Sequence, residues 1–236
     1  MNLTAKTILI TRPMDQAADT IAQFEAKGAK VIHIPLIAIV PPSDGYAGLD
    51  RALAELSSYD WILFTSQNAV AAFFSRPGAK ENMRAALAAV GTKTAEALSR
   101  QGLKNIIVPK DHHAEGLLTV LAEHPLAGKK VLFPRAKEGR DVLADGLRSL
   151  GAKVDLVEAY QTILPKNFDE QRLISLIAEE KLDGIHFASP SAVKNFMAVV
   201  KRAGLEAKLE RLTFFAIGPA TKAALEKAGL NSRPEE

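Results

Sequence analysis

Short apolar runs alternate with helical periodicity along the whole chain. The runs are rich in β-branched and aromatic residues, which is typical of strands buried in a parallel sheet; they are 8–10, 61–64, 106–108, 131–133, 185–187 and 213–217. Apolar positions recur at helical spacing near 15–27, 46–57, 67–75, 92–101, 114–123, 139–150, 169–180, 190–202 and 219–228. This alternation predicts parallel α/β sheets covered by helices, with right-handed crossovers. Glycines directly after four of the helices are predicted C-terminal caps: 28, 102, 151 and 229.

The chain repeats itself once, with an offset of 123 residues. Gly151 follows Gly28 by 123 residues and Asp183 follows Asp60 by 123, whereas Gly218 follows Gly91 by 127. Three motifs recur in the same order in the two halves. A single repeat of this length indicates a duplicated domain rather than a solenoid.

Two extended segments bounded by proline, 35–42 and 157–165, follow a strand directly instead of a helix. We interpret them as connectors that pair with each other, so that the chain leaves one domain and later returns to it. The predicted boundaries are 1–36 with 165–236 for domain one and 41–158 for domain two. Residues 37–40 and 159–164 form the predicted connecting β ribbon.

Composition narrows the class of protein. Hydrophobic residues make up 47% of the 236 residues and the mean hydropathy is +0.02, with no apolar run that approaches a membrane span and no signal-peptide pattern. The absence of cysteine excludes disulfides, thiolate nucleophiles and cysteine-based metal sites, and a cytoplasmic location is the default expectation. The net charge of +3 comes without a Lys/Arg stripe, which argues against nucleic-acid binding. The charge balance suits both a protein that handles a small polyanion and an ordinary mixed surface.

The candidate chemistry lies at turns between strands and helices. In "FTSQNA" (64–69) and "FASPSA" (187–192), Ser66 and Ser189 are predicted N-caps, and Pro190 takes the first helical position. "VGTKT" (90–94) and "IGPAT" (217–221) are predicted to begin helices in the same way. Such turns lie at the carboxyl ends of parallel strands, where helix N-termini bind anions. Every α/β protein needs capped helices, but four matched motifs favour a polyanionic ligand.

Arg12 and Arg135 follow their strands at equivalent places and can bind a carboxylate with two hydrogen bonds. Arg140 precedes Asp141 and is either a ligand contact or half of a surface pair. The histidines show no metal-ligand spacing, and no G-x-S-x-G, P-loop or G-x-G-x-x-G motif is present. Tyr160 lies in a connector, where its phenol either donates a proton to a leaving group or packs as an aromatic wedge.

These motifs, in their order, resemble the uroporphyrinogen-III synthase family over essentially the whole chain. The ordered set that carries the resemblance is Thr11-Arg12-Pro13, Phe64-Thr65-Ser66 with Asn68, Val90-Gly91 with Thr94, Gly139-Arg140-Asp141, Gly151-Ala152, Tyr160, Ser189-Pro190-Ser191, and Ile217-Gly218 with Thr221. Three positions depart from the usual pattern: Ala69, Ala188 and Gln161. Only Gln161, which stands where an arginine is frequent, removes a chemical group.

The resemblance implies two flavodoxin-like α/β domains joined by a two-stranded linker. It also implies a cyclising lyase of tetrapyrrole (heme and siroheme) biosynthesis that uses neither metal nor cofactor and converts hydroxymethylbilane to uroporphyrinogen III, with inversion of ring D and loss of water. We expect a monomer that contacts the preceding deaminase transiently. Tyr160 is implied to assist departure of the hydroxyl group. The implied substrate contacts are Arg12, Thr65, Ser66, Asn68, Gly91, Thr94, Arg135, Arg140, Ser189, Ser191, Gly218 and Thr221.

Two other functions fit part of the pattern. A non-catalytic two-domain hinge protein that binds a small polyanion explains the duplication and the helix N-termini, but not the ordered motif set. An enzyme that handles nucleotides or sugar phosphates suits the fold class, but the missing glycine fingerprints count against it.

Overall fold

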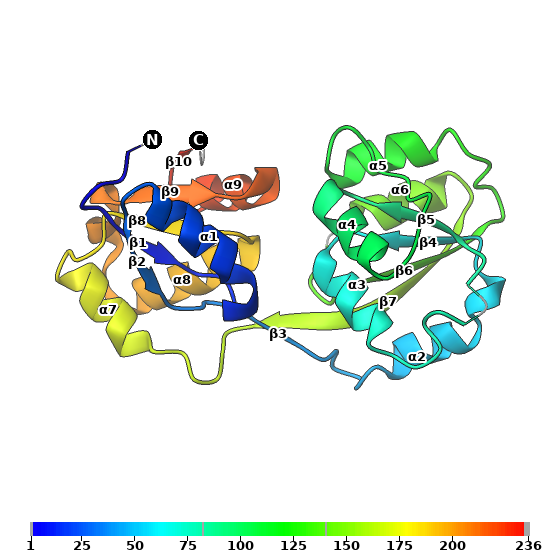
Figure 1. The fold of residues 1–236 in the computed structure, drawn as a ribbon, viewed down its shortest axis with the longest axis horizontal. Helices are drawn as coiled ribbons and strands as arrows, with labels where there is room; N and C mark the ends of the chain where they lie inside the picture. Colours follow the sequence, from blue (N-terminus) through cyan, green and yellow to red (C-terminus); the bar gives the residue numbers. More distant parts are fainter. Residues whose placement is uncertain (1, 82, 140, 234–236) are drawn as a thin grey trace. The chain divides into compact units, whose positions relative to one another are not determined.

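The computed structural model describes residues 2–81, 83–139 and 141–233, which form two α/β units (Figure 1). Unit one comprises Met1–Ala38 with Ile163–Glu236, and unit two comprises Ile39–Thr162. The chain therefore crosses between the units twice. The strands at the crossings, β3 (Ala38–Val40) and β7 (Lys153–Ile163), are neighbours in one sheet.

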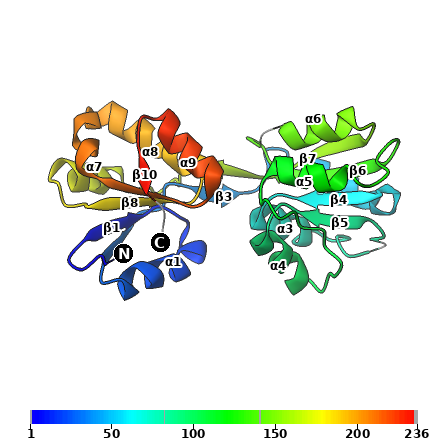
Figure 2. The same ribbon diagram turned by 90° about the horizontal axis from the view of Figure 1, so that it is seen from above.

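The sheet of unit one has the order β10-β9-β8-β1-β2, and its strands pair in parallel. Its bounds are β1 Thr7–Ile10, β2 Lys30–His33, β8 Gly184–Phe187, β9 Thr213–Ala216 and β10 Ser232–Arg233. Successive residues point to opposite faces, so Ile8 and Ile10 pack against α1 (Met14–Ala26), while Leu9 packs on the other side. The helices on that other side are α7 (Glu170–Ala178), α8 (Pro190–Ala203) and α9 (Gly218–Lys227) (Figure 2).

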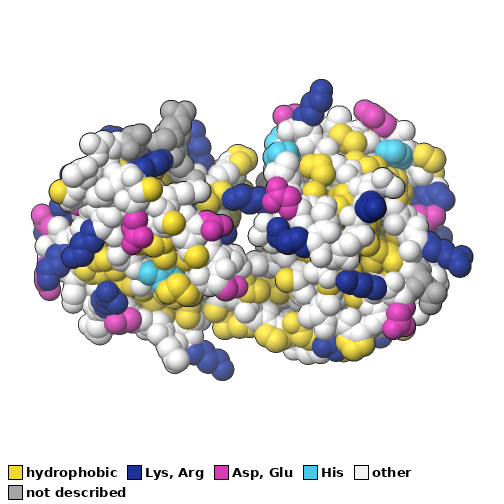
Figure 3. Space-filling view, viewed as in Figure 1, with side chains coloured by type: hydrophobic (Ala, Val, Ile, Leu, Met, Phe, Trp, Pro, Cys, Tyr) yellow, Lys and Arg dark blue, Asp and Glu magenta, His cyan; other side chains and the backbone are white. Residues whose placement is uncertain are grey.

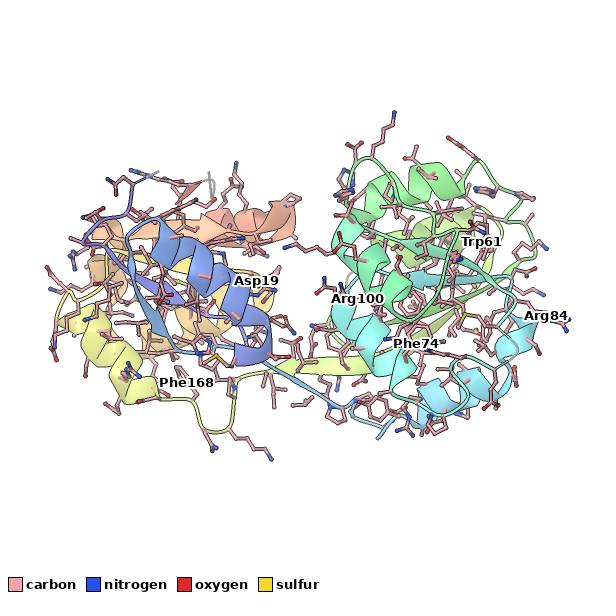
Figure 4. The ribbon with its side chains drawn as sticks, in the orientation of Figure 1. Asp19, Trp61, Phe74, Arg84, Arg100 and Phe168 are labelled. Atoms are coloured by element: carbon pink, nitrogen blue, oxygen red, sulfur yellow. The ribbon has the colours of Figure 1, made fainter. Side chains whose placement is uncertain are left out.

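The sheet of unit two has the order β3-β7-β6-β4-β5, with β4 Trp61–Phe64, β5 Ala86–Ala89 and β6 Lys130–Ala136. One face carries α2 (Ala47–Ala54), α3 (Gln67–Phe74) and α4 (Thr92–Arg100). The other face carries α5 (Ala114–Leu121) and α6 (Val142–Ser149). Trp61 and Phe74, both labelled in Figure 4, belong to these two separate cores, Trp61 with α5 and α6 and Phe74 with α3.

Two α/β units with parallel sheets confirm the predicted fold class. The glycines predicted to end helices all have the left-handed backbone that favours glycine, with φ of 84° at Gly28, 87° at Gly102, 84° at Gly151 and 78° at Gly229. Short 3₁₀ helices at Leu56–Ser58 and Glu206–Arg211 precede β4 and β9.

The predicted strand at 106–108 is wrong. Only Ile107 makes a bridge, to Ala88. Asn105 before it takes a left-handed backbone with φ of 57°, and Pro109 soon after it has no N–H to extend a ladder. Strand β5 was not predicted, because three of its four residues are alanine, which has a weak preference for strands.

A carboxylate clamps the amino end of a neighbouring strand in each unit. Asp183 accepts hydrogen bonds from the Thr7 backbone N–H at 2.9 Å and from the Lys6 ammonium at 3.0 Å. Asp60, the equivalent residue in unit two, accepts hydrogen bonds from the Lys130 backbone N–H at 2.8 Å and from the Lys129 ammonium at 2.8 Å. These contacts join paired strands and help to fix the register of each parallel pair.

We expect Asp183→Asn to lower the stability of the protein at pH 7. The Thr7 N–H is the main reason that the pKa of Asp183 lies below its usual value of 3.8. A lowered folded-state pKa stabilises the fold above the unfolded pKa and ceases to do so as the pH falls through the folded value. The loss should be about 1 kcal/mol after allowance for partial exposure, or roughly 2–4 °C in Tm.

Thermal unfolding of the wild type and the variant between pH 7 and pH 2.5 measures this. The difference in Tm should shrink towards zero at the acid end. Lys6→Ala is the matched control, because it removes the ion pair but keeps the bond from Thr7, so its effect should be smaller. A Tm difference for Asp183→Asn that does not change with pH would contradict this account.

Candidate functional site

The described candidate site residues of both units lie near the carboxyl ends of strands or in the turns that follow them. Because parallel strands end at the same edge of a sheet, each unit gathers its own set there. In unit two these are Thr65, Ser66 and Asn68 after β4, Gly91 and Thr94 after β5, Arg135 in β6 and Tyr160 in β7. In unit one they are Arg12 after β1, Ser189 and Ser191 after β8, and Gly218 and Thr221 after β9. Arg140 lies outside the described residues.

Ser66 joins the start of α3 to Tyr160. It is the N-cap of α3, as predicted, and its hydroxyl oxygen accepts the Ala69 N–H at 3.1 Å. The same oxygen lies 3.0 Å from the hydroxyl of Tyr160, which also hydrogen-bonds to the side chain of Asn68. The sequence pattern found the cap, but not its contact with the tyrosine.

The environment of Tyr160 keeps its phenol protonated. The residue is only 8% exposed. Burial raises its pKa above the usual 10.0, the hydrogen bonds from Ser66 and Asn68 oppose that rise, and the charge of Glu138 adds to it. The phenol is therefore neutral at physiological pH and carries a proton that it can donate in a hydrogen bond.

Unit one carries the same cap without the tyrosine. Ser189 is the N-cap of α8, accepts the Ala192 N–H at 3.2 Å and is followed by Pro190 in the first turn, which confirms both predictions. The residue 123 positions before Tyr160 is Ile37, which is packed in the core of unit one. The side-chain amide of Asn195 in α8 donates to the Leu36 carbonyl at 2.7 Å and holds this segment in place.

The two glycine turns differ from each other. Gly91 is the N-cap of α4 in extended backbone, and a Cβ at this position would lie 3.4 Å from the Cβ of His112. Gly218 is the first residue of α9, capped by Ile217, and its φ of 75° requires glycine. Thr94 and Thr221 are 7% and 2% exposed, so these side chains pack inside their units.

The two arginines are held by different neighbours. The guanidinium of Arg135 lies 2.7 Å from Asp141 and is 13% exposed, and a Cβ at Gly139 would lie 3.1 Å from its Cδ. Gly139 and Asp141 therefore shape the site around this arginine. The Arg12 carbonyl accepts a hydrogen bond from His33 Nε2 at 2.7 Å. No local sequence signal points to this contact, because it spans 21 positions.

A hollow in unit two lies apart from these residues, and surface charges of both signs are mixed. A hollow of about 640 Å³ in unit two lies between α2 and the first half of β7 and is lined by side chains such as Arg51, Arg148 and Asp155, away from the carboxyl edge. Acidic and basic side chains are interspersed on the face drawn in Figure 3. Within the described ranges, no helix is long and apolar enough to cross a membrane.

Comparison with known proteins supplies the family. The family model "Uroporphyrinogen-III synthase HemD" matches residues 18–235. The chain is 36% identical to the uroporphyrinogen-III synthase of Synechococcus elongatus over 93% of this chain and 85% of that protein. It is 30% identical to the uroporphyrinogen-III synthase of Chlorobaculum parvum over 95% of this chain and 90% of that protein.

Solved structures agree on the fold. A mutant uroporphyrinogen III synthase from Thermus thermophilus superposes with a TM-score of 0.66 at 20% identity, over 98% of this chain and 92% of that one. The uroporphyrinogen-III synthetase of Helicobacter pylori gives a TM-score of 0.58 at 20% identity, over 97% and 92% of the two chains. With sequence and fold in agreement along nearly its whole length, this chain belongs to the uroporphyrinogen-III synthase family.

Proposed function

We propose that this chain cyclises hydroxymethylbilane to uroporphyrinogen III, with inversion of ring D and release of water, and that it needs neither metal nor cofactor. The family makes it a cyclising lyase of tetrapyrrole biosynthesis. The observation that supports the proposed site is the buried, protonated phenol of Tyr160 beside the start of α3. The names of the curated relatives do not favour a non-catalytic binding protein.

Tyr160 starts the reaction in this proposal. Its phenol gives a proton to the terminal hydroxyl of the substrate as the carbon–oxygen bond breaks, so that water leaves and an azafulvene cation remains. The far pyrrole attacks this cation at its substituted carbon, and the resulting spiro intermediate fragments and recloses with ring D inverted. The protein contributes by holding the flexible chain in one folded geometry.

The remaining site residues bind carboxylates of the substrate. The first amides of a helix lack partners within the helix, and its dipole favours negative charge there. We assign this role to the starts of α3, α4, α8 and α9, with Thr65, Asn68, Ser191 and the two glycines in the same turns, and to Arg12 and Arg135. Arg140 stays a proposed contact by its motif alone. We also propose that the chain acts as a cytoplasmic monomer and receives its substrate from the preceding deaminase by transient contact.

The direct test supplies purified protein with freshly made hydroxymethylbilane in metal-free buffer that contains a chelator. The oxidised products are then separated into type I and type III isomers. We expect type III to predominate, because only an enzyme that folds the bilane before closure inverts ring D. Formation of type I alone, at the rate of a protein-free control, would sink the proposed function.

Tyr160→Phe should reduce kcat about a hundredfold with little change in KM, because the variant loses a proton donor but keeps the aromatic ring. Steady-state formation of the type III isomer measures it. Tyr46→Phe is the matched control, since Tyr46 precedes α2, away from the carboxyl edge. Equal activity of Tyr160→Phe and the control would remove Tyr160 from the mechanism.

Arg12→Ala should raise KM about tenfold and leave kcat largely intact, because a charge-assisted contact with a carboxylate is lost. Arg211→Ala serves as the control: this arginine ends the 3₁₀ helix before β9, at the amino edge of the same sheet. If both variants shift KM equally, the effect reflects net charge and not a contact made by Arg12.

A further inference from the structure

The two N-cap serines, Ser66 and Ser189, have the same backbone conformation but different side-chain contacts. Ser66 has φ −155° and ψ 153°, and Ser189 has φ −156° and ψ 152°. Both hydroxyl oxygens accept the N–H of the residue three positions on. Only Ser66 also meets a phenol, because the position of Tyr160 is taken by the buried Ile37 in unit one. The duplication thus provides one cap with a tyrosine and one without.

The hydrogen-bonding capacity of Ser66 decides its role. A serine hydroxyl has one proton to donate and two lone pairs to accept with. The Ala69 N–H occupies one lone pair, and either hydroxyl can be the donor across the 3.0 Å between Ser66 and Tyr160, so the proton of Ser66 is available to point at the phenol oxygen. The side-chain amide of Asn68 makes a second hydrogen bond to that oxygen. When Ser66 and Asn68 both donate to its oxygen, the phenol directs its own proton away from Ser66.

We propose that Ser66 is a positioning residue that acts through Tyr160 by donating a hydrogen bond to the phenol oxygen, and not a direct ligand of a substrate carboxylate. The inference deepens the proposed function and rests on it for its role in turnover. As the carbon–oxygen bond of the substrate breaks, its electron pair leaves with the oxygen and the phenol proton completes water. The negative charge left on Tyr160 is held by Ser66 and Asn68 until the proton released on ring closure returns to it.

A double-mutant cycle separates this role from direct binding. Ser66→Ala should lower kcat about fivefold, the worth of one hydrogen bond, with KM nearly unchanged. In the Tyr160→Phe background the same substitution should cause no further loss of kcat. Ser66→Thr should restore most of the activity, because threonine keeps both the cap and the hydroxyl. Equal losses in the two backgrounds would overturn the proposal.

Ser189→Ala controls for the loss of a helix cap. It removes the same bond to a backbone N–H, so its Tm should fall by about as much as that of Ser66→Ala. Any fold-loss of kcat caused by Ser189→Ala should be the same in the wild type and in the Tyr160→Phe background, so that the two effects multiply in the double variant. Ser66→Gly is the second variant, because glycine is tolerated at an N-cap and removes only the hydroxyl. Loss of the non-additivity in Ser66→Gly would also count against the proposal.

The ionisation of Tyr160 gives a readout that does not need turnover. Nuclear magnetic resonance of Cζ-labelled tyrosine follows each of the three phenols, and Tyr160→Phe assigns the signal. Removing Ser66 takes a donor from the phenolate, so the pKa of Tyr160 should rise in Ser66→Ala, return in Ser66→Thr and stay constant in Ser189→Ala. An unchanged pKa in Ser66→Ala overturns the positioning role, whereas absence of type III product from the wild type overturns only the proposed function.

Discussion

Parallel pairing of the strands is the constraint on which the rest of this structure depends. It brings sequence-distant segments to one edge, so that the turns after β4 and β5 gather with the last residues of β6 and with Tyr160 of β7 in unit two. In each unit, one strand pair begins at an aspartate that accepts the first N–H of the neighbouring strand, Asp60 in unit two and Asp183 in unit one. A strand shifted by one residue would turn its buried side chains to the other face and misplace its turn. The clamps at the amino edge therefore help to position the residues at the carboxyl edge.

The duplicated units have similar carboxyl edges in their two sheets, but the side chains at these edges differ. Both carry a capping serine, a glycine turn and an arginine. In unit two the strand corresponding to residues 30–40 continues unbroken as β7 and delivers Tyr160 to Ser66. In unit one the corresponding segment contains Pro35 and ends β2 at His33, so the chain leaves the sheet and buries Ile37 instead. One copy thus carries a buried phenol beside its capping serine, while the other carries the capping serine without a phenol.

Local signals predicted the local parts of the site. Ser66 and Ser189 were recognisable as N-caps, because a small polar residue between an apolar run and a helical pattern has one favourable position. Strand β5 could not be predicted in this way, because its alanines have little strand preference. Its extended conformation depends on pairing with β4 on one side and with Ile107 on the other. The contacts of His33 with Arg12 and of Asp141 with Arg135 escaped as well, because each depends on the path of a loop.

The sequence by itself determined the class of fold, the duplication, the helix ends and the family, because periodicity, glycine at helix ends and an ordered motif set are properties of the chain read locally. Only the tertiary structure decided which polar side chains form hydrogen bonds with each other. Ser66 and Tyr160 are 94 residues apart and meet because β7 and β4 flank β6 in one sheet. The burial that raises the pKa of the phenol likewise comes from packing around it. Hydrogen bonds and pKa values depend on distances of a few ångströms, and folding sets those distances across the sheet.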